Sequence, residues 1–465
     1  MLLCLFVSMT TAERKPLAQE QPQKPNILFI LTDDQAPEDL AGMGNVQSRL
    51  VEKGTSFSNA FATTPACCPS RVSFMRGQYV HNHGVLTNDE TPVAGYDGFI
   101  ELGLQRSTVA TWLDDNGYST FYAGKFLNGY KNTRYVPPGW DRWYAFSSKV
   151  RMDDYVVNEN GELKTYTQDK QHDTYYLRDK AEAFIRSRAQ GRPWFAWVST
   201  HAPHGPQTIA PEFEGSYDDA QMPKPPSYNE ADVSDKPAWV QRRPLMDDDC
   251  STDNGVYDCH KQVVEDWRER QESLMSVDVM VVDLVNALAE TNQLTRTYIV
   301  FASDNGFLHG QHRLYSKGGP YEENQGIPFV VRGPGVRQGV TSEELVANID
   351  LGPTIAEWAG VEAPTYVDGR SFALLLEGTV ASWRRYLLFE QFKHHYAGVR
   401  TAHGETYVEH ESGEKEYYDL TADPWELDSA HSAPENAERI GVLSARLSKL
   451  ESCAGARCRA ADGGP

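Results

Sequence analysis

Long apolar runs are missing from this 465-residue chain beyond its first residues, and basic residues are scarce. The first absence, with 40% hydrophobic residues overall, predicts a soluble globular chain of two domains that has no membrane as a partner. Because basic residues are scarce, 44 Lys and Arg stand against 65 Asp and Glu, which gives a net charge of -21. Such a charge argues against nucleic acid as a partner, and any anionic substrate must be bound by a local group of cations.

Cysteine is also sparse, at seven residues, yet four of the seven fall into two close pairs. The pairs are Cys250 with Cys259 and Cys453 with Cys458. Because these spacings match no zinc pattern, the sequence favours two local disulfides over zinc sites. Disulfides in turn indicate an oxidising compartment.

The N-terminal segment, residues 1–25, reads as a signal-like segment followed by a leader. Residues 1–12 hold a short apolar core and end in small residues, which resembles a secretory signal without its basic beginning. The alternative is a frayed terminus. Residues 13–25 are polar and rich in Pro and Gln. The segment therefore predicts a secreted protein, extracellular or periplasmic, that loses Cys4 with its signal.

Polar residues follow four apolar, strand-like runs, each at the point where the run ends. The runs and the residues that follow them are 26–31 with Asp33 and Asp34, 119–123 with Lys125, 194–200 with His201 and His204, and 297–303 with Asp304 and Asn305. An apolar period of 3.6 residues over 274–288 predicts a helix. Strands that alternate with helices predict an α/β fold with a doubly wound, mostly parallel sheet flanked by helices. Sites in such folds lie at the carboxyl ends of the strands.

Three segments make up the expected domain organisation. Residues 26–375 form the catalytic domain, and the proline-rich stretch 205–258 is a long insertion at the rim of its site, or else a solvated loop. Residues 376–465 form a smaller α+β C-terminal subdomain. Its expected elements are strands at 386–392, 406–410 and 416–420 and a helix at 434–450.

Two groups of residues carry recognisable chemistry. Residues 67–71 read Cys-Cys-Pro-Ser-Arg, which fits the pattern C-x-P-S-R that marks a cysteine for conversion into an aldehyde; the alternative is a cysteine pair in a Ser/Pro turn. The four oxygen-bearing residues Asp33, Asp34, Asp304 and Asn305 suit a hard divalent cation, Ca²⁺ or Mg²⁺, rather than zinc. Taken singly, each of these four could also be a turn or capping residue.

Together these motifs resemble the type I sulfatase family of the alkaline-phosphatase-like superfamily. The resemblance rests on C-x-P-S-R, on Asp-Asp-Gln at 33–35, on Asp-Asn-Gly at 304–306 and on Pro-His-Gly-Pro at 203–206. It extends to Lys317 ahead of Tyr321 and Glu322, and to the tail segment at 417–424. The match covers most of the chain.

The resemblance implies a mechanism and a role for each matched residue. Cys67 would become formylglycine through a formylglycine-generating enzyme. One hydroxyl of its hydrate would attack sulfur and displace the alcohol, and the second would then expel sulfate and restore the aldehyde. The implied ligands of one Ca²⁺, with Mg²⁺ as the alternative, are Asp33, Asp34, Cys67, Asp304 and Asn305. The implied catalytic residues are Cys67, Arg71 facing the hydrate, Lys125 and Lys317 on the sulfate oxygens, and His204 as the acid for the leaving alcohol.

One departure from the family pattern points to a branch within it. Many members read G-K-x-H, whereas Leu127 stands here at the histidine position of Gly-Lys-Phe-Leu-Asn, so a second base is in doubt. This form, with Cys68 in the motif, is similar to the N-acetylglucosamine-6-sulfatase branch. The expected function is therefore a sulfuric ester hydrolase acting on a sulfated carbohydrate, with 6-O-sulfated glucosamine as the expected substrate. The alternatives are an arylsulfatase, a phosphonate or phosphate ester hydrolase with the same nucleophile, and a noncatalytic sulfate- or sugar-binding relative.

Overall fold

The computed structural model describes residues 24–89, 94–147, 150–188, 191–247, 259–380 and 382–464. The expected signal at 1–12, most of the leader and Cys250 lie outside these residues, so the predicted pairing of Cys250 with Cys259 does too. None of the described helices combines the length and the apolar character needed to span a membrane.

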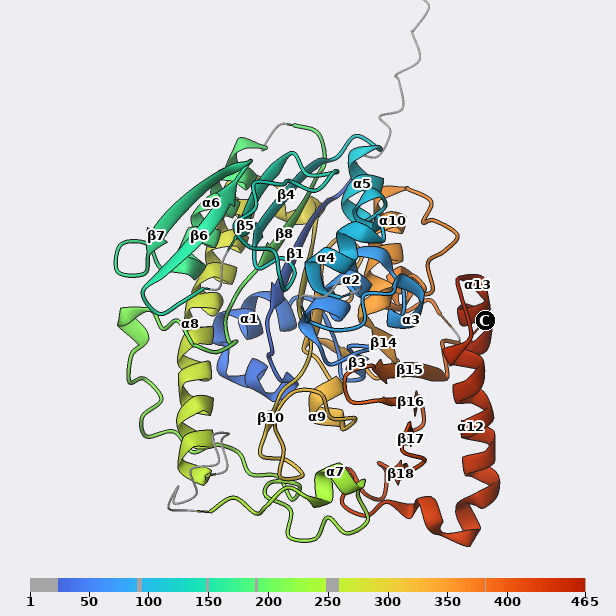
Figure 1. The fold of residues 1–465 in the computed structure, drawn as a ribbon. Helices are drawn as coiled ribbons and strands as arrows, with labels where there is room; N and C mark the ends of the chain where they lie inside the picture. The colour runs from blue at the N-terminus through green and yellow to red at the C-terminus, as the bar shows by residue number, and fades with distance from the viewer. Residues whose placement is uncertain are drawn as a thin grey trace, which may run out of the picture.

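A sheet of ten described strands forms the centre of the molecule (Figure 1). Its order is β13-β2-β12-β9-β1-β8-β4-β5-β6-β7. The strands are β1 (Asn26–Thr32), β2 (Thr55–Phe57), β4 (Ser119–Gly124), β5 (Arg142–Phe146), β6 (Asp154–Glu159), β7 (Glu162–Thr167), β8 (Trp194–Ser199), β9 (Thr297–Ser303), β12 (Phe329–Arg332) and β13 (Val340–Ser342). The central run β9-β1-β8-β4-β5 is parallel throughout, whereas β12, β6 and β7 pair antiparallel with their neighbours. The predicted α/β class is confirmed, with a sheet that is mixed at its edges.

Strand β1 shows why the sheet is covered on both faces. All seven of its residues are buried. Because side chains alternate along a strand, Phe29 packs on one face against Phe74, with ring centroids 5.3 Å apart. Leu28 belongs to the apolar cluster on the opposite face, together with Leu274 and Val277. A strand that is apolar at every position is typical of a parallel sheet with helices on both sides.

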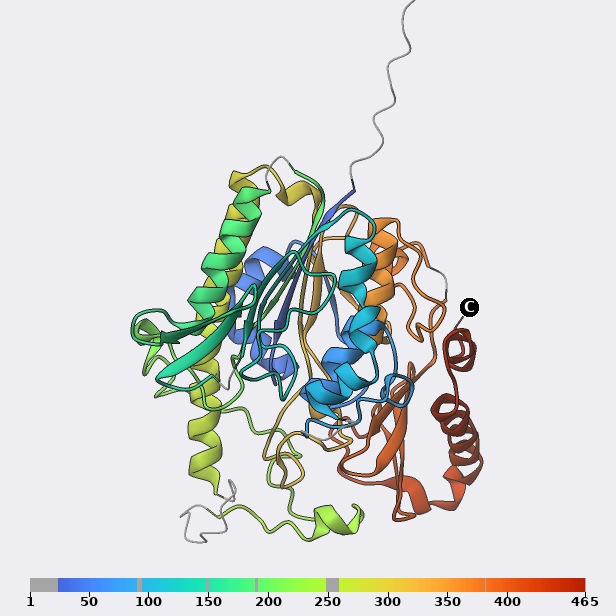
Figure 2. The ribbon, with the colours of Figure 1, turned by 45° about the horizontal axis from the view of Figure 1, so that its top comes forward.

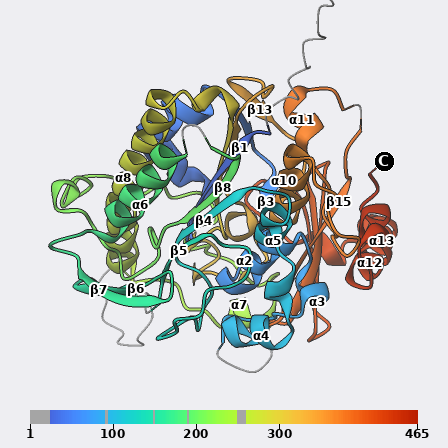
Figure 3. The same cartoon turned by 90° about the horizontal axis from the view of Figure 1, so that it is seen from above.

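The helices form one layer on each face of the sheet (Figures 2 and 3). Helices α6 (Asp173–Ser187) and α8 (His260–Glu290) pack together on one face. Helices α2 (Cys67–Arg76), α5 (Val109–Asp114) and α10 (Leu351–Ala359) cover the other. The helix predicted at 274–288 is confirmed, but it begins earlier, at His260.

A separate antiparallel sheet follows near the C-terminus. It consists of β15 (Tyr386–Gln391), β16 (Tyr396–Thr401), β17 (Glu405–His410) and β18 (Lys415–Asp419), and α12 (Ala437–Glu451) packs against it. The sequence predicted three of these strands and missed β16. The predicted disulfide between Cys453 and Cys458 is confirmed, and it joins the segment after α12 to α13 (Ala456–Ala461).

Short elements connect these layers. They are α1 (Gly44–Val46), β3 (Ala60–Phe61), α3 (Val80–His83), α4 (Gly95–Glu101), α7 (Ala238–Gln241), β10 (Leu308–His309), β11 (Tyr315–Ser316), α9 (Glu322–Gln325), β14 (Val346–Ala347) and α11 (Ala373–Glu377), with single turns at Pro37–Gly42, Gln47–Val51, Leu104–Arg106, Pro211–Phe213, Leu294–Arg296, Asn348–Asp350, Ala430–Ser432 and Pro434–Asn436. The described part of the proline-rich stretch, 205–247, contains α7 and one of these turns, and is otherwise irregular.

Candidate active site

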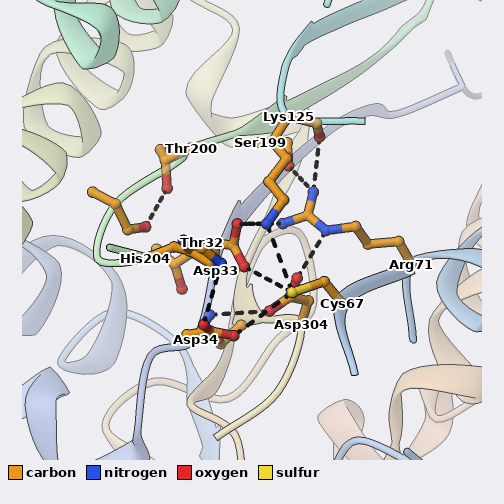
Figure 4. Close-up of polar contacts among 12 residues, drawn as sticks. Thr32, Asp33, Asp34, Cys67, Arg71, Lys125, Ser199, Thr200, His204 and Asp304 are labelled. Atoms are coloured by element: carbon orange, nitrogen blue, oxygen red, sulfur yellow. Dashed lines mark hydrogen bonds and ion pairs between the residues drawn. The ribbon is translucent and has the colours of Figure 1, made fainter. Parts of the chain in front are cut away.

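The parallel strands of the central sheet bring their polar ends to one place (Figure 4). Asp33 and Asp34 follow β1, and Asp304 follows β9, the parallel neighbour of β1. Lys125 follows β4, whose parallel neighbour β8 ends at Ser199. Since β9, β1, β8 and β4 are consecutive and parallel, their carboxyl ends lie at one edge of the sheet. The predicted site is therefore assembled at this edge.

Cys67 is the first residue of α2 and is completely buried. Its Sγ lies 3.3 Å from Oδ1 of Asp33 and 3.7 Å from Oδ1 of Asp34. Burial raises the pKa of the Cys67 thiol well above its ordinary value, and the negative charges of Asp304 and Asp33 raise it further. Because only the thiolate is a strong nucleophile, an unmodified thiol here is protonated and weakly reactive at neutral pH.

Two lysines approach Cys67 from different strands. Lys317 Nζ lies 2.7 Å from Sγ of Cys67, and Lys125 Nζ lies 3.6 Å from it. Each ammonium also pairs with a carboxylate, Lys317 with Asp34 and Lys125 with Asp33. Burial opposes the charge on both lysines, but the carboxylates outweigh it and the pKa of each lysine is raised. Both side chains are thus held as cations beside the sulfur.

Three carboxylates and one amide meet next to these lysines. Asp304 Oδ1 accepts a hydrogen bond from the backbone N–H of Asp34 at 3.1 Å. Burial and the charge of Asp33 raise the pKa of Asp304 to about 6. For Asp34, burial acts to raise the pKa, but Lys317 and His204 outweigh it and hold the pKa at about 2. So many buried carboxylates at one point require compensating positive charge.

The donor set of this cluster fits a hard cation. Asn305 donates from Nδ2 to Oδ1 of Asp34 at 2.7 Å, whereas its own Oδ1 is buried and has no hydrogen-bond partner among the described residues. Rotating the amide by 180° would place that oxygen where Nδ2 is now, facing the same cation position as the carboxylates. One ligand atom each from Asp33, Asp34, Cys67 and His204 also lie within 4.8 Å of one another. Carboxylate and amide oxygens in this number are the ligands that Ca²⁺ and Mg²⁺ prefer.

Arg71 lies one helical turn after Cys67 and is completely buried. Its Nε donates to Oδ2 of Asp304 at 2.8 Å, and one Nη donates to Oγ of Ser199 at 2.6 Å. The same Nη donates to the backbone oxygen of Lys125 at 2.8 Å. The guanidinium therefore joins the ends of β9, β8 and β4. The expectation that it faces the hydrate of residue 67 stays a prediction.

His204 lies at the open side of the cluster. Its Nδ1 donates to the backbone oxygen of Gly205 at 2.6 Å, and its Nε2 lies 3.8 Å from Oδ2 of Asp34. Burial lowers the pKa of His204 to about 4, and the nearby Lys125 lowers it as well. The atom that faces the cluster is thus Nε2, on a side chain that remains 32% exposed. His201 is buried behind it, with ring centroids 5.3 Å apart.

Some supporting residues were not identified from the sequence. Ser70 donates from Oγ to the backbone oxygen of Asp304, and Asn348 Nδ2 donates to that Oγ at 2.9 Å. Ser199 binds Arg71, and its place at the end of β8 was the only signal that could have identified it. Leu127, at the position where many related sequences have histidine, is buried in the apolar core.

Comparison with known proteins matches this chain to one family. Residues 25–361 match the family model described as Sulfatase, and residues 310–453 match the model of the N-sulphoglucosamine sulphohydrolase C-terminal region. An N-acetylglucosamine-6-sulfatase of Capra hircus is 31% identical over 95% of this chain and 86% of its own length. An extracellular sulfatase SULF-1 homologue of Drosophila melanogaster is 36% identical over 76% of this chain, which spans 31% of that longer protein.

A solved structure supports the fold. It is a complex with the substrate D-glucosamine-2-N,6-O-disulfate, and it superimposes with a TM-score of 0.79 over 95% of this chain and 99% of the other. Sequence identity to it is 23%.

Proposed function

Because this chain belongs to the sulfatase family and is a sulfuric ester hydrolase acting on sugars, we propose that it removes the 6-O-sulfate of a glucosamine residue. The similarity to an N-acetylglucosamine-6-sulfatase and the Gly-Lys-Phe-Leu-Asn form at 124–128 support this substrate. The observation that carries the proposal is the position of Cys67, at the start of a helix, with the ammonium groups of Lys125 and Lys317 and the carboxylates of Asp33 and Asp34 close to its Sγ.

We infer that Cys67 acts after conversion to formylglycine. Burial and the nearby carboxylates raise the pKa of its thiol, which makes the unmodified side chain a poor nucleophile and supports action through the aldehyde. One hydroxyl of the aldehyde's hydrate would be the nucleophile and would become bonded to sulfur as the alcohol leaves. The second hydroxyl would then lose its proton and re-form the aldehyde, which expels sulfate together with the first oxygen.

The two lysines bind and orient the sulfate group in this proposal. The ammonium groups of Lys317 and Lys125 both lie close to Sγ of Cys67, and each has hydrogens beyond those used by its carboxylate. Fixed cations at this position stabilise the negative charge that grows on the sulfate oxygens. The start of α2 adds backbone N–H groups that favour an anion.

Asp33, Asp34, Asp304 and Asn305 would hold a single Ca²⁺, with Mg²⁺ as the alternative. A divalent cation at this position supplies charge stabilisation for sulfate oxygens and lowers the pKa of a bound hydroxyl. Arg71 is the residue that positions two of the carboxylates, since it bonds Asp304 and lies 3.6 Å from Asp33.

His204 would give a proton from Nε2 to the oxygen of the leaving alcohol. Its Nδ1 is engaged with Gly205, which leaves Nε2 toward the site. A bound sulfate would offset the charges of Lys125 and Lys317, which act to lower the pKa of His204 in the free site. Binding of the anion therefore favours the protonated ring.

Export is part of the proposal. The disulfide between Cys453 and Cys458 and the extracellular homologue support a protein that works outside the cytoplasm.

The direct test is a set of N-acetylglucosamine sulfates that differ only in position. The proposal predicts release of sulfate from the 6-O ester and little from the 3-O and 4-O esters. A preference for another position would overturn the substrate assignment and leave the family assignment intact.

Paired aryl esters test the alternative activities. The sulfate monoester carries one negative charge, whereas a phosphate monoester carries up to two. The same cations therefore bind the two esters differently, and the ratio of their turnover rates shows which charge the site accepts. Faster turnover of the phosphate or phosphonate ester would overturn the sulfatase assignment. A chain that binds sulfated sugar but hydrolyses no ester would instead be the noncatalytic relative.

A further inference from the structure

A cavity of about 970 Å³ opens beside α7, between the segment that follows this helix and two turns of the C-terminal sheet. Arg242 and Arg243 line it from the α7 side. Lys393 and His394 line it from the turn between β15 and β16. Two segments about 150 residues apart in sequence thus contribute cations to one hollow, on a chain whose net charge is -21.

This cavity is lined by three exposed cations and by two carboxylates, Glu411 and Glu414. Arg242, Arg243 and Lys393 are exposed, and none forms an ion pair with a side chain in the described ranges. Partial burial lowers the pKa of His394, and the charges of Lys393, Arg243 and His395 lower it further.

The acidic residues that also line the cavity are engaged with other groups. Glu414 accepts hydrogen bonds from the backbone N–H of Ala238 and from Oγ of Ser412, both at 2.7 Å. Glu411 lies 3.0 Å from Nδ1 of His395. Among the described residues the cavity thus has three cations outside ion pairs, two of them neighbouring guanidiniums, against these two carboxylates.

His394 connects this cavity to the segment that carries Lys317. A side chain at Gly318 would put its Cβ 2.5 Å from Nε2 of His394, so the ring touches the backbone at this glycine. Gly318 directly follows Lys317, whose Nζ lies 2.7 Å from Sγ of Cys67. The ring of Trp239 lies nearly parallel to that of His394, with centroids 6.1 Å apart, and forms a flat wall of the cavity.

We propose that this cavity, the cationic pocket (Arg242, Arg243, Lys393 and His394), binds an anionic group on the sugar next to the one whose sulfate ester is cleaved. The anion is a sulfate or a carboxylate, since both match a guanidinium fork. The inference rests on the proposed function, because it requires a sulfated sugar at Cys67. It makes a sulfated or uronic-acid oligosaccharide, rather than a single sugar, the preferred substrate.

The test compares four substrates with the same 6-sulfated N-acetylglucosamine at the reacting end. One is the monosaccharide, and three are disaccharides whose second sugar is neutral, sulfated or a uronic acid. For the wild-type chain we expect kcat/KM to be about tenfold higher with an anionic neighbour than with a neutral one, through KM. The anion that gives the larger ratio identifies the natural group.

Variants assign this preference to the pocket. In R242A/R243A and in K393A, the ratio of kcat/KM for anionic over neutral disaccharide should fall toward one. The matched control K449A/R457A removes two exposed cations of α12 and α13 and should keep the ratio. A wild-type ratio near one, or an unchanged ratio in both pocket variants, would overturn the inference while turnover of the monosaccharide upholds the proposed function. If the wild type hydrolyses none of the four, the proposed function itself has failed and the inference with it.

Discussion

Nζ of Lys317 lies 2.7 Å from Sγ of Cys67, although 250 residues separate the two in sequence. The same ammonium pairs with Asp34, so a single cation links the start of α2 to the end of β1. This arrangement holds a positive charge against the residue that carries the proposed nucleophile. Lys317 therefore has the strongest claim to act directly on the substrate.

Replacing Lys317 by Met should lower kcat by about 10²–10³-fold, because a fixed charge that stabilises the transition state is removed from a buried site. Steady-state hydrolysis of an aryl sulfate measures the effect. Lys449→Met, an exposed lysine of α12, is the control and should retain wild-type kcat. A loss confined to KM in K317M would contradict a role in the transition state.

Removal of divalent cations should lower both activity and Tm. With three buried carboxylates in contact, a cation in about 100-fold excess over its Kd should stabilise the folded chain by about 2.7 kcal/mol. Thermal melts of chelator-treated protein, with and without added Ca²⁺, measure this. The rise in Tm should vanish in D34N and in D304N and persist in D115N, a surface control. An equal rise in all three would show that the cation binds elsewhere.

Gly318→Ala should disturb catalysis through backbone geometry. Gly318 has φ of +112° and lies against His394, so a Cβ is excluded by both conformation and contact. The displaced peptide carries Lys317, and we expect kcat to fall by about tenfold or more. Gly360→Ala, at φ +65° with open space around it, shares the strain without the contact. If G360A and G318A lose equal activity, the position of Lys317 is not the cause.

The free energy of unfolding should fall as the pH is lowered below the pKa of a histidine in the unfolded chain, in part because of His83. Burial lowers the pKa of His83 to about 3, and Arg76 and His81 lower it further. The folded pKa lies below the unfolded value of 6.5, so the unfolded state binds more protons as pH falls from 6.5 toward 3. This one group then costs about 1.4 kcal/mol of stability per pH unit in that window.

Urea unfolding at pH 7 and pH 5 measures this dependence. In H83Q the decline between the two pH values should be smaller than in wild type, whereas H403Q, an exposed histidine, should match wild type. A decline of the same size in H83Q would show that other groups are responsible.

The elements that the sequence predicted are those with strong apolar patterns. β9 begins and ends at the predicted residues because its run Thr-Tyr-Ile-Val-Phe-Ala-Ser is apolar and β-branched. β7 was missed because its residues are mostly exposed and polar, as on an edge hairpin. The first 14 residues of α8 carry many charged side chains, which hide the helical period.

The candidate site, like the fold, was predicted in part from the sequence. The ends of β1 and β9 predicted the carboxylates, since parallel neighbours share an edge. That Arg71 binds Asp304 and Ser199 depends on the meeting of three distant segments, which no local pattern encodes. The cationic pocket could not be read from the sequence, because Lys393 joins Arg242 and Arg243 only in the folded chain.

Mass spectrometry of the peptide that contains Cys67 tests the central claim most directly. The protein should be produced with a formylglycine-generating enzyme, and its turnover of the 6-sulfated sugar should be measured on the same sample. The account predicts the aldehyde at residue 67 in a fraction that rises and falls with activity, and no activity in C67A. A fully active sample in which residue 67 remains a thiol would contradict it.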